Sequence, residues 1–323
     1  MANADVDRDL EYIDVVPDKI VTTSLFPHET NQILRSFESA NMSCIALEDE
    51  LIFVDCGAIV DNARKFRQDM EARFDRPTTH LLLTHEHWHA AWGMQAFEDV
   101  TIVIARDGLS YIRTNLKKDG YANLKEAVLR EMPDDEQLRT NIQKTTILVP
   151  HIGVPREKSF ILGPQTEQVI FRSDIIGHTG TSALIHVPSA KVLFTGGTLV
   201  SYGAQQIRII WIGRVYREIE KLDFEKIIPG HGPVVEKSYI APIRQYYDIV
   251  VDKLREFKQE GLTAKQATKR FSELPDYPGK HQDNWVEGSR YHTQELEMTI
   301  KSMYRQVLRE EATVRDSDLM FIK

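Results

Sequence analysis

The sequence predicts an α/β fold that carries a helical extension at its C-terminal end. Two observations lead to this prediction. Short apolar segments, typical of buried strands, alternate with helix-like segments over residues 43–235. Beyond them, apolar residues recur at helical spacing over residues 240–257 and 293–308.

The composition narrows the class of protein. The 323 residues are 42% apolar and 27% charged, which is ordinary globular usage and excludes collagen-like, coiled-coil and disordered chains. The net charge of −8 argues against a nucleic-acid or anionic-membrane surface. Only two cysteines are present, so a disulfide framework is excluded and a cytoplasmic location is expected. We also expect neither a secretory signal nor a membrane span, which needs roughly 20 apolar residues.

The first half of the chain predicts a hairpin, a helix, two strands and an inserted helical segment. Residues 43–57 hold two apolar runs separated by a polar turn. Residues 62–74 carry apolar side chains at intervals of three or four, which favours a helix. Residues 80–84 and 100–105 are nearly all apolar and predict buried strands. Residues 107–146 are charged and helix-like, and we expect them to form an insertion over the core.

The second half predicts more strands before the helical extension begins. Four strands are expected, at residues 168–171, 182–187, 191–195 and 226–228. The last should end at the turn signal Pro229-Gly230. Residues 274–284 are loop-like. We therefore expect one domain over residues 1–240 and a helical extension over residues 241–323 that packs on it.

Five histidines stand at the ends of strands or in glycine-bearing loops. His85, His87 and His89 directly follow a predicted buried strand, and His178 and His231 each lie next to glycines. At a strand end, side chains at positions i and i+2 project to the same side, so two imidazoles can hold one metal ion. Three neutral imidazoles and one water make a tetrahedral zinc site with an open catalytic position. Such a metal lowers the pKa of its bound water to roughly 7.

Further motifs accompany these histidines in a fixed order. They are VDCG at residues 54–57, Gly93, GHTG at 177–180, FTGGT at 194–198 and IIPGHGPV at 227–234. Together they resemble the metallo-β-lactamase fold superfamily over about residues 43–235, and the tail to residue 310 resembles the helical extension of some members. The resemblance implies a four-layer αββα sandwich with two adjacent metals at one edge.

The resemblance implies a complete first metal site. In the superfamily the first metal takes two histidines of the His-x-His motif and the histidine of the GHT loop. Their counterparts here are His85, His87 and His178. An all-imidazole site suits zinc, and iron, nickel and copper are alternatives by ligand type.

The second metal site departs from the family pattern. His89 stands at the position of an aspartate, Ala90 at that of the adjoining histidine and Gly197 at that of the bridging aspartate. Only His231 is retained, so we expect one metal ion, not two. His89 could join the first metal as a fourth ligand, which would close the site, or act as a general base. His231 could bind the substrate carbonyl or stabilise a developing oxyanion.

Neighbouring residues have expected supporting roles. Asp55 should fix a ligand loop rather than act as a catalytic acid. Glu86 is expected at the site mouth or facing solvent. Trp88 and Trp92 either wall a pocket or pack in the core, and His80 is expected to be structural.

The leading hypothesis for the function is a hydrolase with a single metal ion and a metal-bound water. Its substrate would be a small ester, lactone, thioester or amide-like molecule. The alternatives are a non-hydrolytic enzyme such as an iron-dependent oxidoreductase, and a degenerate member without catalysis. We expect a small-molecule substrate and neither nucleic-acid nor membrane partners, and the C-terminal helices could pair in a homodimer.

Overall fold

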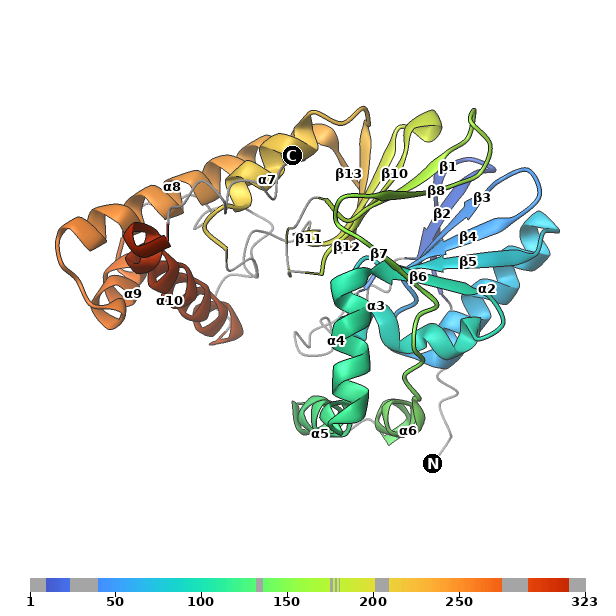
Figure 1. Cartoon of the computed structure of the whole chain (residues 1–323), viewed down its shortest axis with the longest axis horizontal. Coiled ribbons are helices and arrows are strands. Elements are labelled where there is room, and N and C mark those ends of the chain that lie inside the picture. The colour runs from blue at the N-terminus through green and yellow to red at the C-terminus, as the bar shows by residue number, and fades with distance from the viewer. Residues whose placement is uncertain are drawn as a thin grey trace. The chain divides into compact units, whose positions relative to one another are not determined.

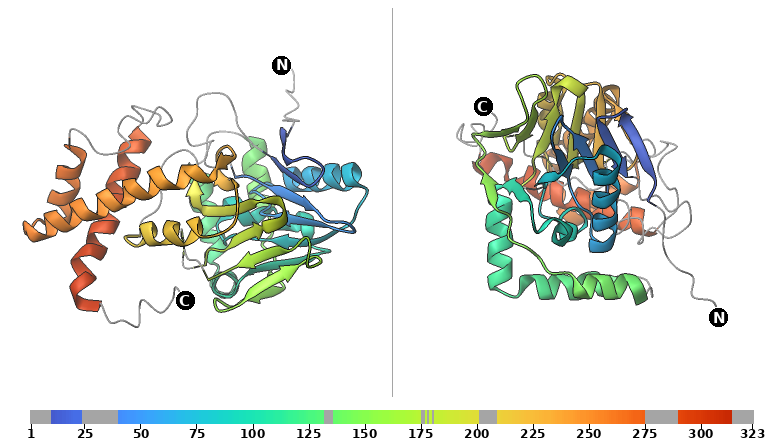
Figure 2. Two further views of the ribbon diagram at one scale, coloured as in Figure 1. Left: turned by 90° about the horizontal axis from the view of Figure 1, so that it is seen from above. Right: turned by 90° about the vertical axis from the view of Figure 1, so that its right-hand side faces the viewer.

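The computed structural model describes residues 10–23, 40–131, 136–174, 177, 179, 181–200, 209–274 and 290–313. The chain divides into two compact units. The first comprises Met1–Leu83, His87–Val103 and Tyr111–Ile152, and the second comprises Thr84–Glu86, Ile104–Ser110 and Gly153–Lys323. Figures 1 and 2 show the elements of both units. In the described part of the chain, we find no helix with the length and apolar character needed to cross a membrane.

A seven-stranded sheet contains the strands of the first half of the chain in sequence order. They are β1 (Tyr12–Val16), β2 (Ile20–Thr23), β3 (Ser43–Ala46), β4 (Leu51–Val54), β5 (Thr78–Leu82), β6 (Thr101–Ala105) and β7 (Ile152–Val154). Strands β1 to β4 pair antiparallel, whereas β5 is parallel to both β4 and β6. The hairpin predicted over residues 43–57 is therefore confirmed as β3 and β4.

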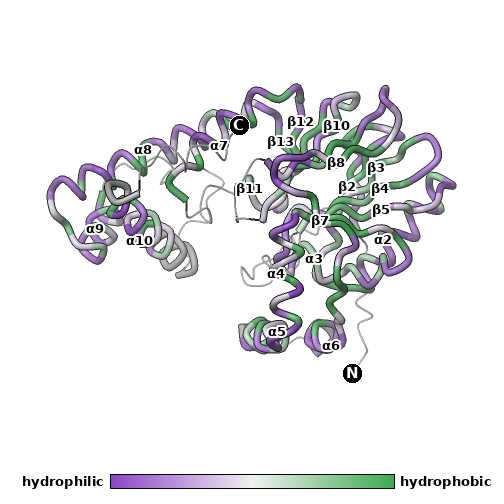
Figure 3. Tube along the Cα trace, in the orientation of Figure 1, coloured by the Kyte–Doolittle hydropathy of each residue, from purple (hydrophilic) through white to green (hydrophobic). Residues whose placement is uncertain are grey.

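Helix α2 (Val60–Phe74) lies against this sheet and confirms the helix predicted over residues 62–74. Its apolar residues bury one face, and the ring of Phe66 meets Phe53 of β4 edge-on at 5.3 Å between centroids. The helix ends at Asp75, which adopts a left-handed conformation and donates its backbone N–H to the carbonyl of Glu71. Figure 3 shows the resulting hydrophobic character of β3, β4 and β5.

Three helices occupy the charged segment predicted to be helical. They are α4 (Arg106–Lys117), α5 (Gly120–Glu131) and α6 (Glu136–Lys144). The expected break at Pro133 lies outside the described residues.

A six-stranded sheet belongs to the second unit and has the order β13-β12-β11-β10-β9-β8. Its strands are β8 (Ser159–Leu162), β9 (Val169–Arg172), β10 (Leu184–Val187), β11 (Val192–Val200), β12 (Lys226–His231) and β13 (Val235–Glu236). All neighbours pair antiparallel except β11 and β12, which are parallel. The four strands predicted here are confirmed.

Two strands of the six-stranded sheet, β11 and β12, continue beyond their predicted ends. Strand β11 continues through the FTGGT motif, and β12 continues through Pro229 and Gly230 instead of turning there. Gly230 of β12 lies close to Gly196 of β11, since a Cβ on Gly230 would stand 2.6 Å from the carbonyl carbon of Gly196. The described ladder between β12 and β13 ends at Ile227, so the missing N–H of Pro229 removes no bond from it.

The helices of the second unit share one core with its sheet. They are α7 (Ile212–Glu220), α8 (Ile240–Gln259), α9 (Ala264–Ser272) and α10 (Arg290–Thr313), and the last three gather in Figure 1. Helices α8 and α10 confirm the two helical segments predicted beyond residue 240. The Nζ of Lys258 in α8 donates to the carbonyl of Val307 in α10 at 2.9 Å. Apart from Leu274, the loop expected over residues 274–284 lies outside the described residues.

Candidate metal centre

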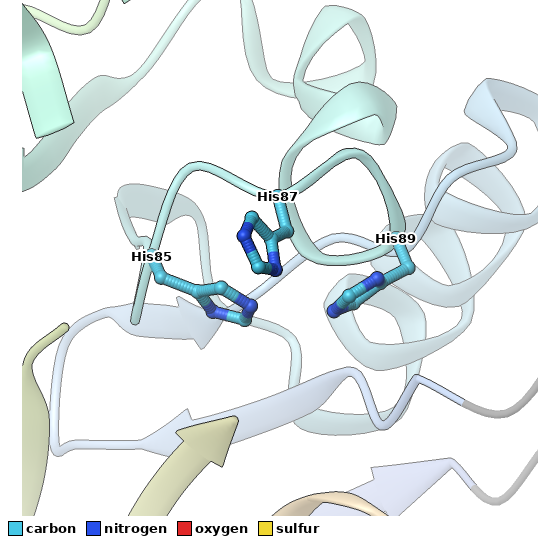
Figure 4. Close-up of side chains that lie close together, drawn as sticks. All are labelled: His85, His87 and His89. Carbon is cyan, nitrogen blue, oxygen red and sulfur yellow. The ribbon is translucent and has the colours of Figure 1, made fainter. Parts of the chain in front are cut away.

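Three histidines of one short segment form a group that could hold a metal ion. One ligand atom from each of His85, His87 and His89 lies within 4.8 Å of the other two. His85 is 1% exposed, and the other two rings are half-buried. Figure 4 shows the three rings turned toward a common space. The group consists only of imidazoles, which suit a borderline metal such as zinc.

The local backbone explains why these three rings converge. Strand β5 ends at Leu82, and the chain is extended at His87, with φ −62° and ψ 146°. The one-turn helix α3 (Trp88–Ala91) begins immediately afterwards and is followed by the 3-10 helix η1 (Trp92–Phe97). The turn brings the ring of His89 to 5.4 Å from that of His87, measured between centroids. His89 therefore lies with the two histidines of the predicted ligand pair.

Thr84 supports the most deeply buried of the three rings. Its Oγ1 lies 2.9 Å from Nδ1 of His85, and its carbonyl accepts a hydrogen bond from the backbone N–H of Ala183 at 2.8 Å. When the ring is neutral and Nδ1 carries the proton, the hydroxyl orients the ring so that Nε2 is the nitrogen offered to a metal. A Cβ on Gly196 would meet the Thr84 side chain at 2.3 Å, so the glycine makes room for it. The sequence analysis did not identify Thr84.

The segment that follows the histidines is fastened to the loop after β4. The carbonyl of Ala90 accepts hydrogen bonds from the backbone N–H of Cys56 at 2.9 Å and from its Sγ at 3.3 Å. The N–H of Gly93 donates to the carbonyl of Gly57 at 2.8 Å. Burial raises the pKa of the Cys56 thiol well above its usual range, so this cysteine is a neutral filler as predicted. Asp55 is also buried, with φ 54°, and donates its N–H to Leu82.

Glu86 lies elsewhere than at the solvent, and the two tryptophans near the histidines have different surroundings. Glu86 is 7% exposed and accepts a hydrogen bond from the hydroxyl of Thr181, so it does not face solvent. The covering residue comes from a loop 95 positions later in the chain. Trp92 is fully buried and belongs to the core, whereas the half-buried Trp88 lies with its ring 5.4 Å from that of His89.

The remaining candidates for the site are placed as follows. His178 lies outside the described residues. His231 is half-buried at the end of β12 and is not a member of the three-histidine group found among the described residues. The Nδ1 of His80, in β5, lies 2.8 Å from the hydroxyl of Thr79, and burial lowers the pKa of the ring. The contact and the burial are consistent with the structural role expected for His80.

Comparisons with known proteins identify the fold. No family model matches the sequence, and no curated protein matches it. Among solved structures, a metallo-β-lactamase from Pontibacter korlensis is 13% identical, with a TM-score of 0.54 over 73% of this chain and 99% of that one. The sec-alkylsulfatase Pisa1 from Pseudomonas sp. is 16% identical, with a TM-score of 0.64 over 97% of this chain and 52% of that one. A double mutant of this sulfatase gives a TM-score of 0.68.

These likenesses concern the fold. The chain has the metallo-β-lactamase fold that its motifs predicted, and the α/β class is confirmed. It spans about half the length of the two sulfatase chains and nearly the whole length of the lactamase.

Proposed function

We propose that this protein is a metal-dependent hydrolase that acts on a small ester, lactone, thioester or amide-like substrate with one metal ion. The observation that carries the proposal is the convergence of His85, His87 and His89. The fold supports it as well, because the similar solved structures include a metallo-β-lactamase and a sec-alkylsulfatase.

The donor set fits a single zinc ion, with iron as the alternative. Three imidazole ligands leave one position of a tetrahedron open, which is the arrangement of catalytic zinc sites. When bound, the metal lowers the pKa of a coordinated water to roughly 7 and polarises a carbonyl group. We propose His85, His87 and His89 as the ligands, because their ligand atoms lie within 4.8 Å of one another.

The residues around the ligands have distinct tasks in this proposal. Thr84 orients the ring of His85, and the bonds from Cys56 to Ala90 hold the helix that carries His89. Partners of this kind would keep the ligand rings oriented for a metal ion. His231 is proposed to bind the substrate carbonyl and to stabilise the negative charge that develops on its oxygen.

A structural metal site is the second candidate, and the position of His89 favours it. If His178 also binds, four imidazoles close the tetrahedron and leave no place for water. The protein would then keep its metal and lack hydrolytic activity. His89 as a general base, the other role expected for it, requires instead that His178 completes the ligand set.

Metal analysis combined with an activity screen tests the proposal. Protein purified without added metal should contain about one equivalent of zinc or iron per chain. It should hydrolyse at least one substrate in a panel of aryl esters, lactones, thioesters, amides and alkyl sulfates. His87→Ala should lose both metal and activity, whereas the matched control His80→Gln should keep both. Two metal equivalents would contradict the single-ion site, and a tightly held metal without hydrolysis would establish the structural alternative.

A further inference from the structure

We propose that Glu86 is a positioning residue, whose buried carboxylate anchors Thr179, Thr181 and Ser182 to the chain beside His85. This inference rests on the proposed function, because its effect is exerted on the metal ligands. Glu86 contributes no ligand atom to the three-histidine group in the part of the chain that the structure describes.

Two bonds join the segment before the helix α3 to the segment before β10. The Thr181 hydroxyl donates to the carboxylate of Glu86, and the N–H of Ala183 donates to the carbonyl of Thr84 at 2.8 Å. The partners on each side are two residues apart, so the two segments run antiparallel at this point. His85 lies between the two anchored residues, and its ring is held by Thr84 as described above.

The carboxylate also sets the direction of a chain of hydroxyl hydrogen bonds. The hydroxyl of Thr181 donates its one proton to Glu86, so its oxygen must accept from Thr179 Oγ1 at 2.6 Å. Thr179 then accepts from Ser182 Oγ at 3.1 Å. Ser182 Oγ in turn accepts the backbone N–H of Thr179 at 2.9 Å. Each hydroxyl in this chain donates once, and the three side chains are fixed in one arrangement.

The hydroxyl chain fixes a segment that is bonded to the chain on both sides of His85. Thr181 is bonded to Glu86 and Ala183 to Thr84, and the hydroxyl of Thr84 holds the ring of His85. A Cβ on Gly177 would stand 2.1 Å from the Thr198 side chain, so Gly177 packs directly on β11. Gly177 is thus held by packing, and Thr179 and Thr181 are held by a chain of hydrogen bonds that ends on the buried carboxylate of Glu86. Glu86 is 7% exposed, and a buried carboxylate without a hydrogen-bond donor is costly in free energy. This cost favours the state in which the Thr181–Glu86 hydrogen bond is made.

The test compares metal binding in variants of the two anchor residues. Thr181→Val removes the hydroxyl with little change in volume and should weaken zinc binding about 10- to 100-fold, as measured by competition with a chelator. The absorption spectrum of the cobalt-substituted protein should change, because the ligand field changes. Thr181→Ser restores the hydroxyl and should return both readouts to native values. Glu86→Gln keeps an acceptor oxygen but not the charge, and should weaken zinc binding less than Thr181→Val.

A threonine outside the site gives the matched control. Thr268→Val in α9 also removes a donating hydroxyl, here one bonded to the backbone carbonyl of Ala264 at 2.8 Å, and should leave zinc affinity and the cobalt spectrum unchanged. If Thr181→Val does not fold, the comparison of Glu86→Gln with the native protein decides, and equal zinc affinity overturns the inference. Native protein that binds no metal would overturn the proposed function together with this inference. Native metal binding that Thr181→Val leaves unchanged would overturn this inference alone.

Discussion

Gly93→Ala offers a quantitative test of how the histidine segment is held. An added Cβ would stand 2.1 Å from the carbonyl oxygen of Cys56 and 3.0 Å from the Cβ of Ala63. An ordinary contact between carbon and oxygen is about 3.3 Å or longer. The obstructing oxygen belongs to the backbone, so no change of rotamer relieves the clash. Gly93 cannot retreat without stretching its bond to the carbonyl of Gly57.

The expected cost follows from these two contacts. Overpacking of a buried position costs about 1–3 kcal/mol, and loss of one backbone hydrogen bond adds about 1 kcal/mol. A rigid backbone obstacle places the overpacking near the upper end, so we expect a loss of about 3–4 kcal/mol in the free energy of unfolding. The thermal midpoint of this 323-residue chain should fall by roughly 4–6 °C. Because η1 continues directly from the helix that carries His89, metal affinity should fall too.

Urea unfolding of the metal-free protein, followed by circular dichroism, measures this loss. Gly261→Ala is the matched control, since Gly261 has φ 73° and a Cβ there would meet no heavy atom within 4 Å. That variant should cost only the strain of a left-handed residue, about 1 kcal/mol. If Gly93→Ala is no more destabilised than Gly261→Ala, the tight approach to Cys56 does not stabilise the segment and our reasoning is refuted.

Three further predictions concern individual buried groups. Burial lowers the pKa of His186 in the folded protein, so the unfolded chain takes up a proton first as the pH falls. The free energy of unfolding should therefore decrease as the pH falls below about 6.5 towards the folded pKa. In His186→Gln, the urea midpoint should fall less between pH 8 and pH 5 than it does in the native protein. The Nε1 of the fully buried Trp92 has no hydrogen-bond partner among the described residues, so Trp92→Phe should cost less than the 3–5 kcal/mol typical of Trp→Ala in urea unfolding. The Tyr304 hydroxyl donates to the carbonyl of Leu262 at 2.7 Å, so Tyr304→Phe should lose about 1 kcal/mol in the same assay while zinc content stays unchanged.

The parts of the fold that sequence reasoning could predict are those with strong local patterns. Strands β4 and β6 are nearly continuous apolar runs, and α2 and α8 repeat apolar residues at helical intervals. Strand β1 was not predicted, because its pattern YIDVV includes exposed and charged positions. Only pairing with a neighbour along the sheet shows that such a segment is a strand.

Some features of the site follow from neighbouring residues in the sequence, and others depend on contacts between distant segments. The cluster of His85, His87 and His89 follows from spacing and from one turn of helix, both of which are local. The burial of Glu86 depends on Thr181, and the sequence alone does not indicate that these two residues meet. The continuation of β12 through Pro229 depends on β11 lying beside it, which overrides the turn preference of Pro-Gly.

The three clustered imidazoles come from only five consecutive residues, and this has a consequence for how the ion and folding are coupled. Bringing together ligands so near in sequence costs about 2–3 kcal/mol less chain entropy than recruiting one from about 90 residues away. A denatured chain can therefore chelate zinc through this pentapeptide. Because binding to the unfolded state subtracts from the stabilisation that a ligand confers, added zinc should raise the melting temperature less than its affinity for the native protein implies.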